Sequence, residues 1–250
     1  MPTPARPLRV AIAAIRSAAT YLLVSLYVVV VGPPALLLGL FTPIENLVYA
    51  LSNGGVRLAL ALSGIRVRVS GRERQPAQRA AVYCGNHESN VDAPILFHAL
   101  HPRLHMLYKA EFAKVPILGQ AIKHARCVPV YREDRDRSIR WLDEAVPMLR
   151  AGTSFLFFPE GTRSRPGALL PFKKGGFIMA IKAQAPIVPV ALHGSYEAMT
   201  RGSALIHPVT ISVRIGEPIE TAGLTLDDRD ALIERVRGRM QELLARAPSL

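Results

Sequence analysis

Residues 80–92, AAVYCGNHESNVD, decide the fold, because a short apolar run leads directly into a polar turn. The apolar part has the length and composition of a buried strand, and the residues after Asp92 read as a helix. Side chains at the end of such a strand point out of the carboxyl edge of the sheet, where open α/β folds bind their ligands. We therefore expect His87 at this edge and Asp92 in the first turn of the following helix.

The alternation of strands and helices continues from residue 65 to the end of the chain. It predicts an α/β fold with a mixed, mostly parallel sheet flanked by helices. Strands are expected at residues 65–71, 80–86, 104–110, 126–131, 154–159, 187–193 and 209–216. Helices are expected at residues 93–100, 134–150, 174–183 and 226–245. The last helix opens with Thr225 and Asp228 in capping-box spacing.

The N-terminal part of the chain is far too apolar for a solvated helix. No charged side chain occurs between Arg16 and Glu45, and residues 46–65 are nearly as apolar. Segments of this kind lie in or on a bilayer. We therefore expect residues 1–65 to form a membrane-associated helical hairpin, followed by an α/β domain over residues 66–250.

A single spanning helix is the alternative to this hairpin. Gly32, Pro33 and Pro34 are expected to interrupt the first apolar arm, because proline removes a helical hydrogen bond. Residues 17–31 alone would reach about 22 Å as a helix, which is short of the hydrocarbon core of about 30 Å. We therefore favour a hairpin whose second arm returns to the starting side.

The chain carries 31 Lys and Arg against 19 Asp and Glu, a net charge of +12, which indicates an anionic partner. Only 6% of the residues are aromatic and no nucleic-acid-binding module occurs, so we expect anionic membrane lipids and no nucleic acid. Arg6, Arg9 and Arg16 precede the apolar arm. They predict that the protein lies on the cytoplasmic face of the inner or plasma membrane.

Neither the cysteines nor the histidines predict a metal site. Cys84 and Cys127 stand alone among apolar residues. His98, His101 and His105 run out of a helix, through a proline and into a strand, so their side chains would not converge. We therefore expect no metal ion.

His87 and Asp92 are spaced as a general base and its orienting partner. Asp92 would accept a hydrogen bond from one ring nitrogen of His87, and the other nitrogen would take a proton from a hydroxyl group. Asn86 and Ser89 would orient the loop. The alternative is that Asp92 only caps the helix and that His87 is an ordinary loop residue.

A second cluster follows the apolar strand in residues 155–167, FLFFPEGTRSRPG. Backbone amides near Gly161, the hydroxyl of Thr162 and the guanidinium of Arg163 would form a phosphate cradle. Lys173 would add positive charge. The alternative is a solvated basic loop between a strand and a helix.

Four ordered blocks resemble those of the glycerolipid acyltransferase family. NHESNVD, residues 86–92, resembles the first block of that family, and FPEGTRS, residues 158–164, resembles the third. YKAEFAKVPILG, residues 108–119, resembles the second, and APIVPVAL, residues 185–192, resembles the fourth.

The resemblance implies a membrane-bound enzyme that moves a fatty acyl group from a thioester to the free hydroxyl of lysophosphatidic acid, giving phosphatidic acid. His87 would be the base and Asp92 its partner. Glu160, Gly161 and Arg163 would hold the glycerol phosphate of the acceptor, helped by Lys109. No cofactor is implied, because acyl-CoA or acyl carrier protein brings the acyl group as a co-substrate.

The chain departs from the family pattern at Asn90 and Val91, where many relatives carry an aromatic residue after the serine of the first block. The departure leaves other acceptors open, such as lyso-ornithine lipid, glycerol-3-phosphate or another lysophospholipid. A non-catalytic scaffold that binds anionic membranes is a more remote alternative. Neither Cys84 nor Ser89 lies in the G-x-S-x-G turn expected of a nucleophile.

Overall fold

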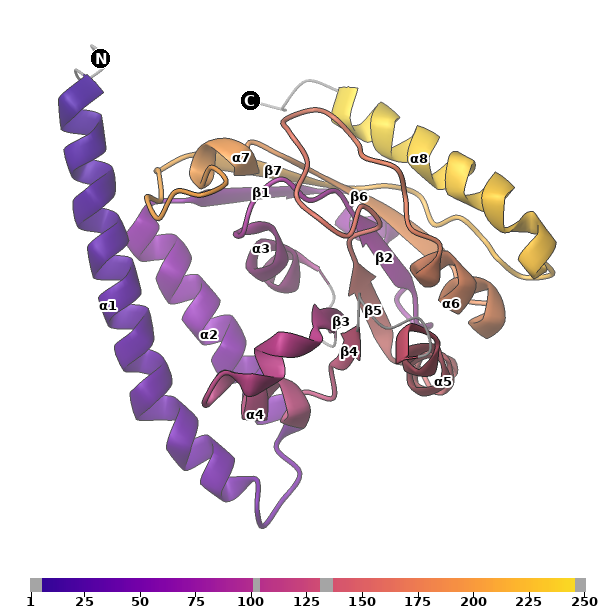
Figure 1. The fold of residues 1–250 in the computed structure, drawn as a ribbon, viewed down its shortest axis with the longest axis horizontal. Helices are drawn as coiled ribbons and strands as arrows, with labels where there is room; N and C mark the ends of the chain where they lie inside the picture. Colours follow the sequence, from indigo (N-terminus) through magenta and orange to yellow (C-terminus); the bar gives the residue numbers. More distant parts are fainter. Residues whose placement is uncertain (1–5, 101–103, 131–136, 246–250) are drawn as a thin grey trace.

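The computed structural model describes residues 6–100, 104–130 and 137–245. Its helices form an N-terminal hairpin and a layer on each face of a central sheet (Figure 1). They are α1 (Arg6–Leu38), α2 (Glu45–Ser63), α3 (Asp92–Ala99), α4 (Leu118–His124), α5 (Arg137–Arg150), α6 (Gly175–Ala183), α7 (Ser195–Ala198) and α8 (Arg229–Ala245). Short 3-10 helices are η1 (Arg72–Arg74), η2 (Ala110–Lys114) and η3 (Leu226–Asp228).

The two apolar N-terminal arms fold back on each other along one flank of the molecule (Figure 1). The Tyr27 hydroxyl of α1 donates a hydrogen bond of 2.9 Å to the carbonyl oxygen of Leu51 in α2. The stretch Val10–Leu38 is long and apolar enough to cross a bilayer, and almost none of its most apolar part is buried in the protein.

The prediction that glycine and proline interrupt the first arm is wrong, because α1 continues through Gly32, Pro33 and Pro34 to Leu38. Tertiary packing explains the difference. A Cβ atom at Gly32 would lie 2.7 Å from Cγ2 of Ile117, so the glycine lets the segment before α4 pack directly on the helix. This contact stabilises the last turns although the prolines remove two backbone donors.

Within the described residues, seven strands form one sheet in the order β1-β7-β6-β2-β5-β3-β4. Among these described strands, five of the six neighbouring pairs are parallel, and β6 and β7 pair antiparallel. The predicted α/β class with a mixed, mostly parallel sheet is therefore confirmed. The strands are β1 (Arg66–Ser70), β2 (Val82–Gly85), β3 (Leu104–Lys109), β4 (Val128–Val130), β5 (Ser154–Phe157), β6 (Ile187–His193) and β7 (Thr210–Ile215).

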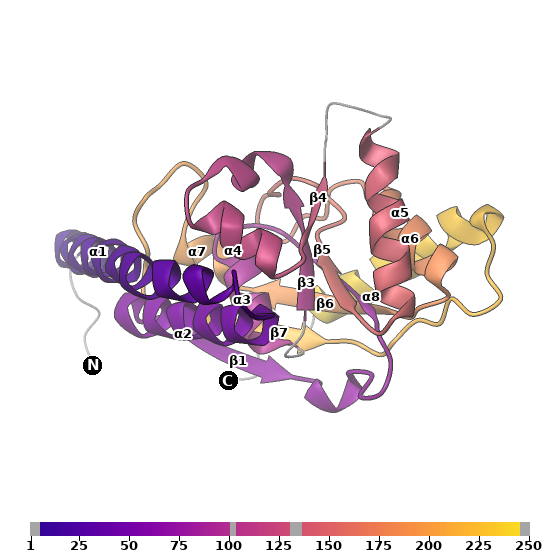
Figure 2. The same ribbon diagram turned by 90° about the horizontal axis from the view of Figure 1, so that it is seen from below.

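The two faces of the sheet are both covered by helices. In Figure 2, α1 and α2 lie at one side of the molecule and α5, α6 and α8 at the other. Successive residues of β2 alternate between two cores: Cys84 packs with Phe177 and Met240 under α6 and α8, whereas Tyr83 packs with Leu96 of α3. This period of two is the pattern of a strand that is buried on both faces.

The sheet brings the two predicted loops together. β2 lies between β5 and β6, with Cys84 opposite Phe157 and Pro189. Because these three strands are parallel, the loops that follow them leave the same edge of the sheet. One of these loops carries His87, and the loop after β5 carries Arg163.

Most of the predicted helices are present, with some differences at their ends. The capping box is confirmed, since the N–H of Thr225 donates to Oδ2 of Asp228 at 2.8 Å, but a 3-10 turn precedes α8. Residues 134–136 of the helix predicted over residues 134–150 lie outside the described residues. The sequence did not predict α4 or α7.

Candidate active site

His87 and Asp92 contact each other across the turn between β2 and α3. Nδ1 of His87 lies 2.9 Å from Oδ2 of Asp92. The same oxygen accepts the backbone N–H groups of Glu88 and Ser89, both at 2.7 Å. Asp92 is completely buried. Since a carboxylate only accepts, Nδ1 carries the proton, and Nε2 of the neutral ring is left as an acceptor.

The His87 ring lies flat against Phe158, the first residue after β5. The ring centroids are 4.3 Å apart and the planes meet at 22°. The His87 side chain is 21% exposed, and Nε2 has no hydrogen-bond partner among the described residues. A proton acceptor of fixed orientation is therefore open to solvent.

Asn86 and Ser89 hold the loop on either side of His87. The Asn86 side chain donates to the carbonyl oxygen of Leu192 at 3.0 Å and accepts the N–H of the same residue at 2.7 Å. The Ser89 hydroxyl donates to the carbonyl oxygen of Met199 at 2.8 Å. Both side chains are buried, so they fasten the loop to β6 and to the segment after α7.

Glu160 bridges the two loops. Its Oε1 accepts the N–H of His87 at 3.0 Å, and its Oε2 accepts the N–H of Leu170 at 2.9 Å. The side chain is 2% exposed. Both carboxylate oxygens are thus occupied inside the protein, whereas the sequence placed Glu160 against the phosphate of the acceptor.

The loop after β5 lies against the His87 loop and presents cationic groups. The N–H of Ser164 donates to the carbonyl oxygen of His87 at 2.8 Å. Gly161 has a φ of +66°, and a Cβ atom there would lie 2.9 Å from Cε of Lys173, so the lysine chain runs over the glycine. Arg163 is half-buried and, in the described part of the chain, forms no hydrogen bond or ion pair.

Thr162 and Lys109 were also predicted to bind the acceptor phosphate. Thr162 is exposed beside Arg163. Lys109 ends β3, which pairs with β5, but its side chain lies outside the described part of the structure. The predicted site residues other than Lys109 therefore gather on the loops after β2 and β5 and at Asp92, the first residue of α3.

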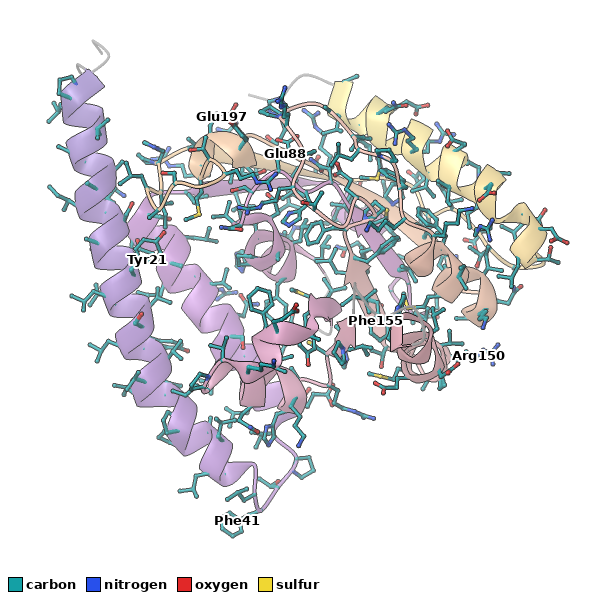
Figure 3. All side chains as sticks on the ribbon, viewed as in Figure 1. Tyr21, Phe41, Glu88, Arg150, Phe155 and Glu197 are labelled. Atoms are coloured by element: carbon teal, nitrogen blue, oxygen red, sulfur yellow. The ribbon has the colours of Figure 1, made fainter. Side chains whose placement is uncertain are left out.

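Glu88 is a part of the site that the sequence did not predict. Its Oε1 accepts the N–H of Gly167 at 3.1 Å, which ties the His87 loop to the tip of the neighbouring loop. Burial raises the pKa of Glu88 to about 6, and the carboxylates of Asp92 and Glu197 raise this pKa as well. Figure 3 labels Glu88 and Glu197 on neighbouring segments. The only signal in the sequence was its position directly after His87.

The histidines considered as metal ligands have separate partners. Nδ1 of His98 lies 2.8 Å from Oδ1 of Asn53, and Nε2 of His105 lies 3.2 Å from Oε1 of Glu45. His101 lies outside the described residues. Among the residues that the structure describes, no three potential ligands come together for a metal ion.

Two apolar cavities open beside the start of α3. One of about 280 Å³ lies among α2, α3, β3 and α4, and the other of about 310 Å³ lies mainly between α1 and α2. Both are lined by Val56 of α2, Pro94 of α3 and Ala121 of α4. Pro94 belongs to the helix that begins at Asp92, but neither His87 nor Asp92 is among the residues that line the two cavities.

Comparisons with known proteins relate the chain to one family. The family model described as Acyltransferase matches residues 66–193. A 1-acyl-sn-glycerol-3-phosphate acyltransferase of Limnanthes douglasii is 33% identical over 180 residues, which cover 72% of this chain and 63% of that protein. A 1-acyl-sn-glycerol-3-phosphate acyltransferase alpha of Homo sapiens is 33% identical over 180 residues, which cover 72% of this chain and 64% of that protein. The chain thus spans slightly less than two thirds of the length of these two relatives.

A solved structure resembles almost the whole chain. The crystal structure of the 1-acyl-sn-glycerophosphate (LPA) acyltransferase PlsC from Thermotoga maritima superposes with a TM-score of 0.81 at 24% identity. The match covers 97% of this chain and 100% of the other. The likeness shows that the fold is shared, N-terminal helices included.

Proposed function

The chain belongs to the acyltransferase family, and on this premise we propose that it transfers a fatty acyl group from an acyl thioester to the free hydroxyl of lysophosphatidic acid, forming phosphatidic acid. The relatives from Limnanthes douglasii and Homo sapiens are named for the acceptor 1-acyl-sn-glycerol-3-phosphate. The observation that carries the proposal is the 2.9 Å contact between His87 and Asp92, which leaves Nε2 exposed.

In the proposed reaction, Nε2 of His87 takes the proton of the acceptor hydroxyl while the hydroxyl oxygen attacks the thioester carbonyl. Asp92 keeps Nδ1 protonated and stabilises the imidazolium that forms. The tetrahedral intermediate then expels the thiolate, which takes the proton back from Nε2. The carbon–oxygen ester bond replaces the carbon–sulfur bond, and the base returns to its starting state.

Neither candidate nucleophile suits a covalent alternative. Cys84 is completely buried, and burial raises the pKa of its thiol well above the usual range, with a further contribution from the Glu160 carboxylate. The Ser89 hydroxyl is buried and donates to the carbonyl oxygen of Met199. A thioester is already activated, so direct attack by the acceptor needs no acyl-enzyme.

The acceptor phosphate is proposed to bind on the loop after β5. Arg163, the hydroxyl of Thr162 and the ammonium of Lys173 supply donors, and Lys109 adds a further charge. The N–H of Gly161 already donates to the carbonyl oxygen of Phe158 at 3.1 Å, so it shapes the turn and does not reach the phosphate. Guanidinium and ammonium groups bind phosphate strongly because their hydrogen bonds are charge-assisted. Glu160 acts in this proposal as the bridge that sets the spacing of the two loops, since its oxygens accept backbone N–H groups.

An acyl chain is proposed to occupy the two apolar cavities beside α3 while its thioester lies at His87. Both cavities are lined by Pro94 of α3, and α3 is the helix that begins at Asp92, which supports this assignment. The donor is acyl-CoA or acyl carrier protein, both acidic, which suits the net charge of +12. No cofactor takes part in this scheme.

Residues 1–65 are proposed to anchor the α/β domain, residues 66–250, to anionic lipid on the cytoplasmic face of the membrane. Large apolar side chains of the hairpin face outward, with Leu22 70% exposed and Phe41 82% exposed. Such a surface is stable only against another apolar phase. Figure 3 shows Phe41 at the tip of the hairpin, away from the sheet.

The proposal is tested with purified protein in lipid vesicles, assayed with lysophosphatidic acid, glycerol-3-phosphate and lyso-ornithine lipid and with both thioester donors. Phosphatidic acid is expected as the main product. A preference for another acceptor would replace the proposed one, and absence of acyl transfer with every pair would overturn the enzymatic proposal in favour of a membrane-binding scaffold.

A further inference from the structure

The return arm of the loop that carries Arg163 is held by the C-terminal helix α8. Arg237 donates from Nη2 to the carbonyl oxygen of Leu169 and from Nη1 to that of Leu170, both at 2.8 Å. Its guanidinium carbon also lies 5.2 Å from the centre of the Phe172 ring. Two hydrogen bonds from one planar group fix the direction of the chain as well as its position.

The peptide group between Leu169 and Leu170 lies between opposite charges. Its carbonyl oxygen accepts from Arg237, and its N–H donates to Oε2 of Glu160 at 2.9 Å. Hydrogen bonds at both ends of one amide polarise it and strengthen each other. The positive charge of Arg237 therefore acts on Glu160 through a single amide.

The buried negative charge of Glu160 requires positive charge nearby. A buried carboxylate without a counter-charge is costly, and this one is 2% exposed. Within residues 6–100, 104–130 and 137–245, no lysine, arginine or histidine side chain forms a direct ion pair with it. Its Oε1 accepts the N–H of His87. The contacts thus run without interruption from Arg237 to the backbone of the proposed base.

We propose that Arg237 is a positioning residue for acyl transfer. It holds the return arm of the phosphate-binding loop and balances the charge of Glu160, so that Arg163 and His87 keep their relative placement. The inference rests on the proposed function. Arg237 lies outside the four sequence blocks, and its partner Leu169 is 68 positions away.

Steady-state kinetics provide the first test, with Arg239→Ala as the control. Arg239 is on the same helix and, among the residues that the structure describes, pairs with the exposed Glu242 alone, at 2.8 Å. Arg237→Ala is expected to raise KM for lysophosphatidic acid about 10-fold and to leave KM for the thioester unchanged. The reason is that the two hydrogen bonds from Arg237 support the loop proposed to bind the acceptor phosphate and not the proposed site of the acyl chain. Arg237→Lys should recover only part of the effect, since lysine lacks the planar fork. An unchanged acceptor KM in folded Arg237→Ala would overturn the inference.

A double-mutant cycle on stability provides the second test and needs no activity. Urea midpoints are compared for the wild type, Arg237→Ala, Glu160→Gln and the double variant. If the two charges act on each other, Arg237→Ala lowers the midpoint less in the Glu160→Gln background. Equal shifts in both backgrounds would contradict the inference. A wild type that acylates nothing would instead contradict the proposed function, and the cycle would still decide the role of Arg237.

Discussion

Asp92 determines which ring nitrogen of His87 carries the proton. Its Oδ2 accepts Nδ1 of His87 together with the backbone N–H groups of Glu88 and Ser89. In Asp92→Asn, a carbonyl oxygen at the position of Oδ2 can still accept all three hydrogen bonds, so the ring keeps its orientation. The variant lacks the negative charge that stabilises the imidazolium formed when Nε2 takes the proton of the acceptor. We expect kcat to fall on the order of 10³-fold with little change in the acceptor KM.

His87→Ala removes the base itself and should lower kcat by about 10² to 10⁴-fold without affecting vesicle binding. Both variants are measured with saturating thioester, and circular dichroism serves as the control for folding. Activity of His87→Ala close to the wild type would exclude His87 as the base.

The raised pKa of Glu88 predicts how the stability of the folded protein depends on pH. Its pKa is raised from 4.5 to about 6 in the folded protein, mainly by burial. The folded state therefore holds this proton more tightly than the unfolded state, and the stabilisation is complete below pH 4.5 and is lost as the pH rises through about 6. The loss is at most about 2 kcal/mol.

Glu88→Gln keeps an oxygen for the N–H of Gly167 but cannot ionise. We expect its free energy of unfolding in urea to exceed that of the wild type at pH 7 and the difference to vanish near pH 4.5. Glu234→Gln, at an exposed position of α8, is the control. A constant difference across this range would show that the Glu88 carboxyl does not titrate in it.

At the scale of the element, the loop after β5 is tied to its surroundings by backbone groups. Lys174 at its end pairs with Asp230 at 3.4 Å, whereas Arg163 and Lys173 form no ion pair within the described residues. Arg163→Ala should therefore raise KM for lysophosphatidic acid about 10-fold and leave kcat nearly unchanged. Arg165→Ala, two positions along the same loop and exposed, is the matched control. An effect confined to KM of the thioester would move Arg163 to the donor subsite.

Helix α4 borders both apolar cavities through Ala121. A phenylalanine at this position would fill part of the shared space, so Ala121→Phe should shift the preference for acyl donors toward shorter chains. Gln120→Phe, at the neighbouring exposed position, controls for added bulk on α4. The measurement is kcat/KM for a series of saturated thioesters. An unchanged profile would place the acyl chain elsewhere.

At the scale of the whole molecule, the sequence predicted those features that depend on residues close together in the chain. The strands follow from short apolar runs, and the His87 and Asp92 contact follows from a spacing of five residues across one turn. The course of α1 through Pro33 could not be predicted, because it depends on the packing of Ile117 against Gly32. For the same reason the cavities and Arg237 had no signal in the sequence, since their contacts join distant segments.

The last prediction concerns the apolar flank of α1. If this flank contacts the bilayer, it sets where the proposed catalytic loops lie relative to their lipid substrates. Leu22 is 70% exposed, and a charge there would have to enter the hydrocarbon if α1 contacts the bilayer. Leu22→Glu is therefore expected to weaken binding to phosphatidylglycerol vesicles and to lower acyl transfer in vesicles, whereas activity in detergent persists. Gln241→Glu adds the same charge at an exposed position of α8 and should leave vesicle binding intact. Flotation assays report the binding. Equal binding of both variants would contradict membrane contact through this face of α1 and would place the lipid surface on another part of the molecule.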